Sequence, residues 1–348
     1  MRPPGGRWLA LDLARGVAVV SMVVAHTAPV GGIFNVSEYL TAPLFALAIG
    51  ASMTLAFEKT RLSFGRFWAA EVARGAVLVG LGVLLEAAYP QILGVLISLG
   101  LLMALLPPLL LLRHRIGLLL VVVGVLALAL PPLRLAGEAW LAYQGPPASP
   151  GQTITHWIVY ITVAHPAYRL PAFGVAAGLG ILAARLLEER PPTNRTALLG
   201  AAGAATLSGT AIVVGKITGW GGDPYAGTYP ELVASTAIAV AALLGCVAWA
   251  RHHEATRLRS VTWLVESTGR LALTAYALHV LALAALSRFV LGGGRDDHWW
   301  VLVTVTAIVV AFAALWRRWV GPIGPAEWLV RWPMRLLGHP TEAGTRRR

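Results

Sequence analysis

The stretch LDLARGVAVVSMVVAHT, residues 11–27, decides the fold. It is long and apolar enough to insert into a bilayer, yet it carries Asp12, Arg15 and His26. A signal-peptide core has about 7–15 uninterrupted apolar residues and a small-residue cleavage site. This segment is longer and is interrupted by Arg15, so we expect it to be retained as the first membrane helix.

The composition extends this interpretation to the whole chain. Of the 348 residues, 57% are hydrophobic and only 13% are charged, whereas a soluble domain has about 25% charged residues. The apolar residues form blocks of roughly twenty, the length that crosses a bilayer core. The sequence therefore predicts an all-α, polytopic integral membrane protein. A single cysteine, Cys246, excludes an internal disulfide and a cysteine-built metal site.

About ten transmembrane helices are expected in one domain over residues 1–348. The expected spans are 8–29, 39–57, 67–86, 91–112, 116–133, 170–187, 196–215, 231–250, 269–290 and 299–316. Segment 134–169 is expected to be an outer-side loop whose end, THWIVYITVAHPAYR, forms a short interfacial or re-entrant piece. Residues 317–348 are expected to be a cytoplasmic tail.

The basic residues predict the orientation. Of the 28 lysines and arginines, twenty fall in the loops and tail on the N-terminal side and three in the opposite loops. Such a bias marks the cytoplasmic side, so we expect both termini in the cytoplasm of a multi-pass protein of the cell (inner) membrane. This placement also explains the net charge of +12 without a nucleic-acid partner.

Arg15 and His26 share one face of the first helix. They are eleven residues apart, which places them about 20° from the same face and about 16 Å apart along the axis. Lipid rejects both groups, so the stripe is expected to face the bundle interior. Two other interpretations stay open. Arg15 can reach the headgroups with Asp12 as its ion-pair partner, and His26 can be an interfacial histidine with satisfied hydrogen bonds.

An arginine, ten residues and a histidine in the first membrane helix, preceded by an aspartate, resembles the membrane-bound acyltransferase-3 proteins. LDLARGVAVVSMVVAH with LTAPLFALAIGASMTLAF in the second helix is similar to the heparan-α-glucosaminide N-acetyltransferase family. GPAEWLVRW, residues 324–332, resembles a motif at the end of bacterial relatives of that family. The matches cover residues 8–57, 269–280 and 324–332, about a fifth of the chain.

The resemblance implies acyl transfer across the membrane. The donor would be a cytoplasmic acyl-CoA, typically acetyl-CoA, and the acceptor a sugar amine or hydroxyl on the outer side. His26 would be the catalytic residue. The glucosaminide branch places its histidine in the loop after the first helix, but residues 30–38 contain none. Imidazole can act as a base for the attacking group or form a transient acyl-histidine. Arg15 is the candidate for the CoA phosphates, because guanidinium pairs well with phosphate.

Three further residues are candidates for the site. Glu38 begins the second helix and can orient His26, or it can be a solvated acid at the headgroups. His279 lies near the middle of its expected span, with Tyr276 three residues earlier on the same face. Both are candidates for a substrate pocket, while a hydrogen bond between helices would equally explain His279.

Aromatic and basic residues precede the sixth span. His165 and Arg169, with His156 and Tyr168, suit a sugar-like or anionic acceptor, although an ordinary interfacial belt has the same composition. No HExxH motif or tight histidine–carboxylate cluster is present, so no metal is expected. The pair His252–His253 is expected to be solvated.

A transporter or flippase is the competing function, with Arg15, His26 and His279 along a substrate or proton path. Transporters often have two related halves, and none are visible here. The expected partners are the lipid bilayer and a small-molecule or glycan acceptor. A homodimer stays open.

Overall fold

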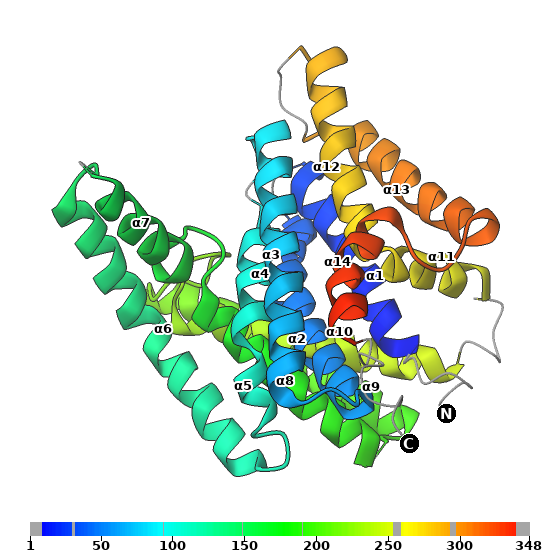
Figure 1. The fold of residues 1–348 in the computed structure, drawn as a ribbon, viewed down its shortest axis with the longest axis horizontal. Helices are drawn as coiled ribbons and strands as arrows, with labels where there is room; N and C mark the ends of the chain where they lie inside the picture. The colour runs from blue at the N-terminus through cyan, green and yellow to red at the C-terminus, as the bar shows by residue number, and fades with distance from the viewer. Residues whose placement is uncertain are drawn as a thin grey trace, which may run out of the picture.

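Every regular element in the described part of the computed structural model is a helix (Figure 1). The structure describes residues 9–29, 32–92, 94–147, 149–189, 191–252, 259–292 and 297–338. His253 and eight of the basic residues counted for the orientation lie outside these ranges; the eight are Arg2, Arg7, Arg190, Arg257, Arg295, Arg346, Arg347 and Arg348.

Nine helices in the described residues are long and apolar enough to cross a membrane. They are α1 (Leu9–Thr27), α2 (Val36–Lys59), α3 (Phe64–Ala88), α6 (Ile116–Gln144), α8 (Leu170–Glu189), α9 (Asn194–Thr218), α10 (Tyr229–His252), α12 (Ala272–Phe289) and α13 (Trp299–Trp319). The shorter elements are η1 (Gly32–Asn35), α4 (Val95–Leu105), α5 (Pro107–Leu110), α7 (Pro150–Val159), the π-helix η2 (Tyr160–Ala164), α11 (Arg259–Arg270) and α14 (Pro325–Gly338). The prediction of an all-helical, multi-pass membrane protein is confirmed.

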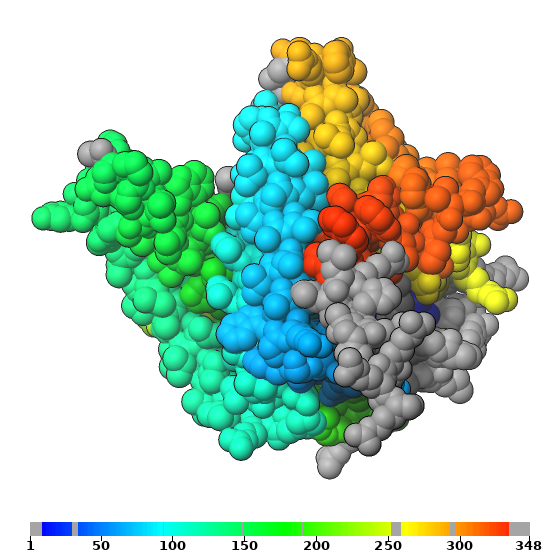
Figure 2. All heavy atoms as spheres, in the orientation of Figure 1, coloured from blue at the N-terminus to red at the C-terminus, as the bar shows by residue number. Residues whose placement is uncertain are grey.

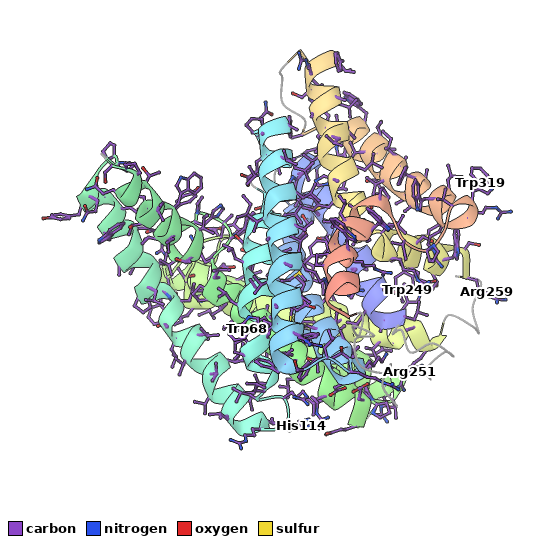
Figure 3. All side chains as sticks on the ribbon, viewed as in Figure 1. Trp68, His114, Trp249, Arg251, Arg259 and Trp319 are labelled. Carbon is purple, nitrogen blue, oxygen red and sulfur yellow. The ribbon has the colours of Figure 1, made fainter. Side chains whose placement is uncertain are left out.

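Helices α1 and α2 form the centre of the bundle. Helix α1 packs on α2, α10 and α11, and α2 packs on α8 and α10. The α3–α4 pair lies on one side, while α6 and α7 extend away from the rest and contact it mainly through α8 and η2 (Figure 1). Trp249 of α10 donates its indole N–H to the Thr262 hydroxyl of α11 at 2.9 Å (Figure 3).

Small residues let α1 and α11 approach closely. A Cβ at Gly16 would collide with the backbone carbonyl of Val265, and a Cβ at Gly269 would collide with that of Asp12. Glycines are typical of helix contacts in membranes, where close backbone approach provides the packing energy. This contact brings the end of α11 beside Asp12 and Arg15.

The fourth expected span, 91–112, is shorter than predicted. Helix α4 ends at Leu105, and α5 is a separate turn that starts at Pro107. Proline lacks a backbone N–H and clashes with the preceding turn, so Pro107 and Pro108 end α4 early. Seven of the eleven residues of α4 are buried, and the helix packs on α3.

The fifth expected span was predicted to end at residue 133, but α6 continues to Gln144. Proline at 132 cannot donate to the carbonyl of Leu128, which should leave that group without its helical partner. The hydroxyl of Tyr229 donates to this carbonyl at 2.9 Å. The helix thus passes through Pro131–Pro132 because a neighbouring helix satisfies the freed carbonyl.

The ninth expected span is broken, and the C-terminal segment is more ordered than predicted. Residue Leu271 forms a turn between α11 and α12. Beyond α13, helix α14 returns and packs on α3 and α12. Figure 2 shows α14 (red) at the surface between α3 (blue) and the α12–α13 pair (gold and orange).

Candidate active site

A cavity of about 340 Å³ lies between the central helices. Its lining comes from α1, α2, α3, α4, α11, α12 and α14. One part is apolar, with side chains that include Phe45, Leu78, Leu96, Leu99 and Met103. The cavity is within the usual size range of small-molecule pockets, at its lower end.

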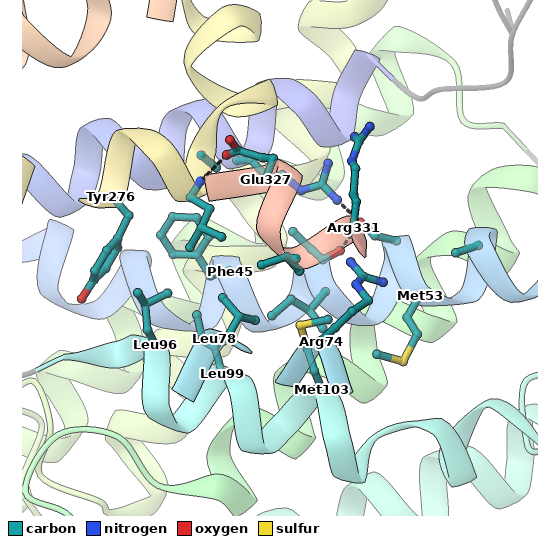
Figure 4. Close-up of a pocket in the computed structure, with 18 of the residues that line it drawn as sticks. Phe45, Met53, Arg74, Leu78, Leu96, Leu99, Met103, Tyr276, Glu327 and Arg331 are labelled. Atoms are coloured by element: carbon teal, nitrogen blue, oxygen red, sulfur yellow. Dashed lines mark hydrogen bonds between the residues drawn. The ribbon is translucent and has the colours of Figure 1, made fainter. Parts of the chain in front are cut away.

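Charged side chains from four helices line the same cavity. They are Arg15, Glu71, Arg74, Arg270, Glu327 and Arg331. Figure 4 shows Tyr276 at one end of the lining and Arg74, Arg331 and Met53 toward the other. The cavity therefore has a charged part rich in arginine and an apolar part that ends at Tyr276.

Arg15 is both paired and exposed to the cavity. It donates to Asp12 at 3.1 Å and to the Ser52 hydroxyl at 2.5 Å. Asp12 is 1% exposed and also contacts Arg270, with 3.2 Å between Asp12 Oδ2 and Arg270 Nε. A buried carboxylate needs such partners. Arg15 can therefore form the ion pair with Asp12 and still contact a ligand in the cavity.

Two other cavity arginines, Arg74 and Arg270, are also held by carboxylates. Glu71, fully buried, accepts from Arg74 at 2.6 Å. Glu266 lies 2.7 Å from Arg270 and 3.6 Å from Arg317. These pairs fix the guanidinium groups in place, and the lining has more arginines than carboxylates. The cavity therefore suits an anionic ligand.

His26 and His279 meet beyond the Tyr276 end. Their ring centroids are 5.4 Å apart with an interplanar angle of 84°. The ring of Tyr276 lies 5.1 Å from that of His279. The structure thus brings together three of the predicted residues, and Tyr276 links the two imidazoles to the cavity.

The hydrogen bonds of His279 define its tautomer. Its Nδ1 lies 2.5 Å from the carbonyl of Tyr276, and a carbonyl only accepts, so Nδ1 carries the proton. Nε2 then holds the lone pair and has no hydrogen-bond partner among the described residues. His279 is completely buried, and an unpaired buried polar atom in a folded protein requires an explanation, of which a catalytic role is one.

Glu38 and Arg169 line a second cavity of about 30 Å³ with Tyr39, Tyr225 and Glu231. Loop 219–228 is fixed to it, because the Tyr39 hydroxyl donates to the Gly222 carbonyl and Arg169 donates to the Tyr225 carbonyl at 3.0 Å. Tyr225 has a positive φ of 63°, a strained conformation for a bulky residue.

Burial lowers the pKa of Arg169, and Glu231 opposes that shift. The contact predicted between Glu38 and His26 stays a prediction.

The His165 side chain stabilises the turn before α8. Its Nδ1 accepts hydrogen bonds from the backbone N–H groups of Ala167 at 3.1 Å and Tyr168 at 2.8 Å. Burial, with a smaller effect of Arg169, lowers its pKa to about 4. His165 is therefore neutral at physiological pH, and its role in substrate binding stays a prediction.

Sequence reasoning missed Glu71, Arg74 and Glu327 as cavity residues. The rule that drew attention to Arg15, a charged group inside a membrane span, applies equally to Glu71 and Arg74. Glu327 lies in GPAEWLVRW, which entered only through its resemblance. In the described residues, no three histidine, cysteine or acidic side chains are grouped to hold a metal ion.

The sequence matches a known protein family. The sequence signature of the family described as an acyltransferase domain, acyltransferase 3, matches residues 8–317. No curated protein matches the chain.

Proposed function

Because the chain belongs to the acyltransferase 3 family of membrane-bound acyltransferases, we propose that it moves an acyl group from acyl-CoA to a hydroxyl or amine acceptor. Membership of the family implies transferase activity. The donor, the acceptor and the residues below are our proposal. In it, residues 1–348 work as one transmembrane unit with both termini in the cytoplasm.

The arginine-rich part of the large cavity would bind the donor. Arg15, Arg74 and Arg331 come from three helices and can pair with the phosphates of CoA. The apolar lining suits the narrow arm that carries the thioester. The excess of basic residues on the N-terminal side of α1 supports entry of the donor from the cytoplasm. Acetyl-CoA is the expected donor because of the resemblance described above.

The observation that carries the proposal is the contact between His26 and His279. In the proposed step, His26 takes the proton of the acceptor hydroxyl or amine, whose oxygen or nitrogen attacks the thioester carbonyl. The carbon–sulfur bond breaks, and the imidazolium returns the proton to the leaving thiolate. The lone pair on His279 Nε2 can accept a hydrogen bond from His26 when His26 is protonated. A transient acyl-His26 is the alternative order of events.

The acceptor would approach from the opposite end of α1. Glu38, Arg169 and Tyr225 gather there around the smaller cavity, and carboxylate, guanidinium and phenol groups suit a sugar-like acceptor. Glu38 is proposed to orient His26 from this side. His165 would contribute by holding the turn that precedes Arg169.

The test is thiol release by the purified protein in nanodiscs, with acetyl-CoA and a panel of amino sugars and sugar alcohols. Wild type, His26→Ala and the control His298→Ala, which changes an exposed histidine, are compared. Acceptor-dependent release that is lost only in His26→Ala supports the proposal. Absence of both release and acyl-CoA binding, including longer acyl chains, contradicts it. Substrate flux without CoA would instead support a transporter.

A trapped intermediate separates the two orders of events. Mass spectrometry of protein quenched during turnover without acceptor would find an acyl group on His26 only if the acyl-histidine forms.

A further inference from the structure

The break between α11 and α12 leaves backbone donors that need partners. The first N–H groups of any helix have no acceptor within the helix. At the start of α12 these include the N–H groups of Leu273 and Thr274. An unsatisfied backbone donor inside a membrane protein costs several kcal/mol, so a group from elsewhere must accept these bonds.

Glu327 of α14 is that group. Its Oε1 accepts from the N–H of Leu273 at 2.7 Å and from that of Thr274 at 3.0 Å. Its Oε2 accepts from the Thr274 hydroxyl at 2.5 Å. A carboxylate at a helix N-terminus is also stabilised by the helix dipole. One side chain thus replaces the hydrogen bonds that are lost at the break.

The contact between α12 and α14 is reciprocal. The Thr274 hydroxyl, which donates to Glu327, also accepts from the N–H of Ala326 at 3.2 Å. A Cβ at Gly324 would collide with Glu327 and with the Thr274 hydroxyl. The approach to α14 is fixed by Trp316, whose indole N–H donates to the Ile323 carbonyl at 3.0 Å. Each helix therefore caps the other, and only glycine fits at 324.

This cap lies at the candidate site. Glu327 lines the large cavity together with Leu273 and Tyr276, and Figure 4 shows Glu327 and Tyr276 in that lining. His279 follows Tyr276 by three residues in α12, about one helical turn. Helix α14 begins after residue 317, where the match to the family ends. The half-helix that carries Tyr276 and His279 thus begins on a side chain outside the matched region.

We infer that Glu327 is a positioning residue for the acyl transfer proposed above. It fixes the start of α12, and through that helix it sets where Tyr276 and His279 stand relative to His26. Both carboxylate oxygens are already occupied by donors. Its contribution is therefore the geometry of the helix and not a proton transfer. This inference rests on the proposed function.

The experiment compares Glu327→Ala, Glu327→Gln and Leu329→Ala with wild type. The glutamine oxygen can still accept from both backbone N–H groups, whereas alanine removes the cap. Leu329 lies on the exposed face of the same helix and controls for changes to α14 itself. Two quantities are measured: thiol release from acetyl-CoA, and hydrogen exchange of the peptide that begins α12, followed by mass spectrometry.

In Glu327→Ala we expect exchange at the start of α12 to rise about ten-fold. We expect kcat to fall about 30-fold, with less than about a three-fold change in the KM for the donor. Glu327→Gln should restore slow exchange and most of kcat, and Leu329→Ala should resemble wild type. A merely structural role would instead lower the amount of folded protein and leave kcat per folded molecule unchanged.

Two results would overturn the inference. One is unchanged exchange in Glu327→Ala, which contradicts the cap. The other is faster exchange with unchanged kcat, which contradicts the positioning role. A wild-type protein that releases no thiol is a different failure, because it contradicts the proposed acyl transfer, while the exchange measurement still decides on the cap.

Discussion

The rings of His26 and His279 meet edge to face at 5.4 Å, although the two residues lie near opposite ends of the chain. Within the part of the chain that the structure describes, Nδ1 of His279 has a hydrogen-bond partner, the carbonyl of Tyr276, and Nε2 has none. The proposed function therefore gives the two ring nitrogens of His279 separate roles: Nδ1 holds the ring, and Nε2 accepts a hydrogen bond from His26.

His279→Asn separates these roles. The asparagine amide can still donate to the Tyr276 carbonyl, but it has no basic nitrogen in place of Nε2. A hydrogen bond to a charged group, here protonated His26, contributes about 1.5–3 kcal/mol, so we expect kcat to fall about 10- to 100-fold with the fold intact. Steady-state thiol release and the melting temperature of the same preparation check this. Unchanged kcat would show that His279 only packs against His26.

Arg15 should act on donor binding. Arg15→Lys keeps the charge but loses the planar fork that binds both Asp12 and Ser52. We expect the KM for acyl-CoA to rise about ten-fold in Arg15→Lys and more in Arg15→Ala. The rise should be smaller for a donor thioester that lacks the nucleotide phosphates. Equal losses with both donors would contradict a phosphate contact.

The close contact of α1 and α11 predicts that two glycine-to-alanine variants differ in thermal stability. Gly269→Ala forces a Cβ against the Asp12 carbonyl, and overpacking of this kind costs about 1–3 kcal/mol or more. Gly245→Ala in α10 places its Cβ where no atom lies within 4 Å, so it should cost nothing. Thermal unfolding in detergent measures both. Equal melting temperatures would show that α1 and α11 can move apart without loss.

The lowered pKa of His165 predicts that the stability of the protein depends on pH. Its pKa falls from an ordinary value of 6.5 to about 4 in the folded protein. The unfolded chain therefore binds more protons between pH 4 and 6.5. The contribution to stability is complete above about pH 6.5 and is lost as the pH falls toward 4. At pH 5 the loss is about 2 kcal/mol.

His165→Asn tests this contribution. An asparagine oxygen can accept the same backbone N–H groups without titrating, so the melting temperature of the variant should change less between pH 7 and pH 5 than that of wild type. The same slope in both proteins would assign the pH dependence to other groups.

The residues of the site that could be predicted are those on a single helix. The spacing of eleven residues predicts that Arg15 and His26 lie on one face of α1. The spacing of three residues predicts that Tyr276 and His279 lie on one face of their helix. Helical periodicity determines such neighbours, so the sequence alone suffices. The all-helical class followed from the length of the apolar blocks.

Partners on different helices could not be predicted in this way. The fifth span was expected to end at residue 133, because the sequence does not show that Tyr229 satisfies the Leu128 carbonyl freed by Pro132. The break at Leu271 has no proline, and it depends on Glu327, which follows Thr274 by 53 residues. Long-range hydrogen bonds of this kind depend on packing, which periodicity does not encode.

The cap on α12 also sets an order of events during synthesis. All nine candidate spans precede Glu327 in the chain, so each of them leaves the ribosome before the carboxylate that fixes α12 exists. A nascent chain that ends after α13 carries both histidines but lacks the cap at the start of α12. The proposed catalytic geometry is therefore completed only when translation has passed α14, and the half-made protein in the membrane should consume the donor more slowly than the finished chain.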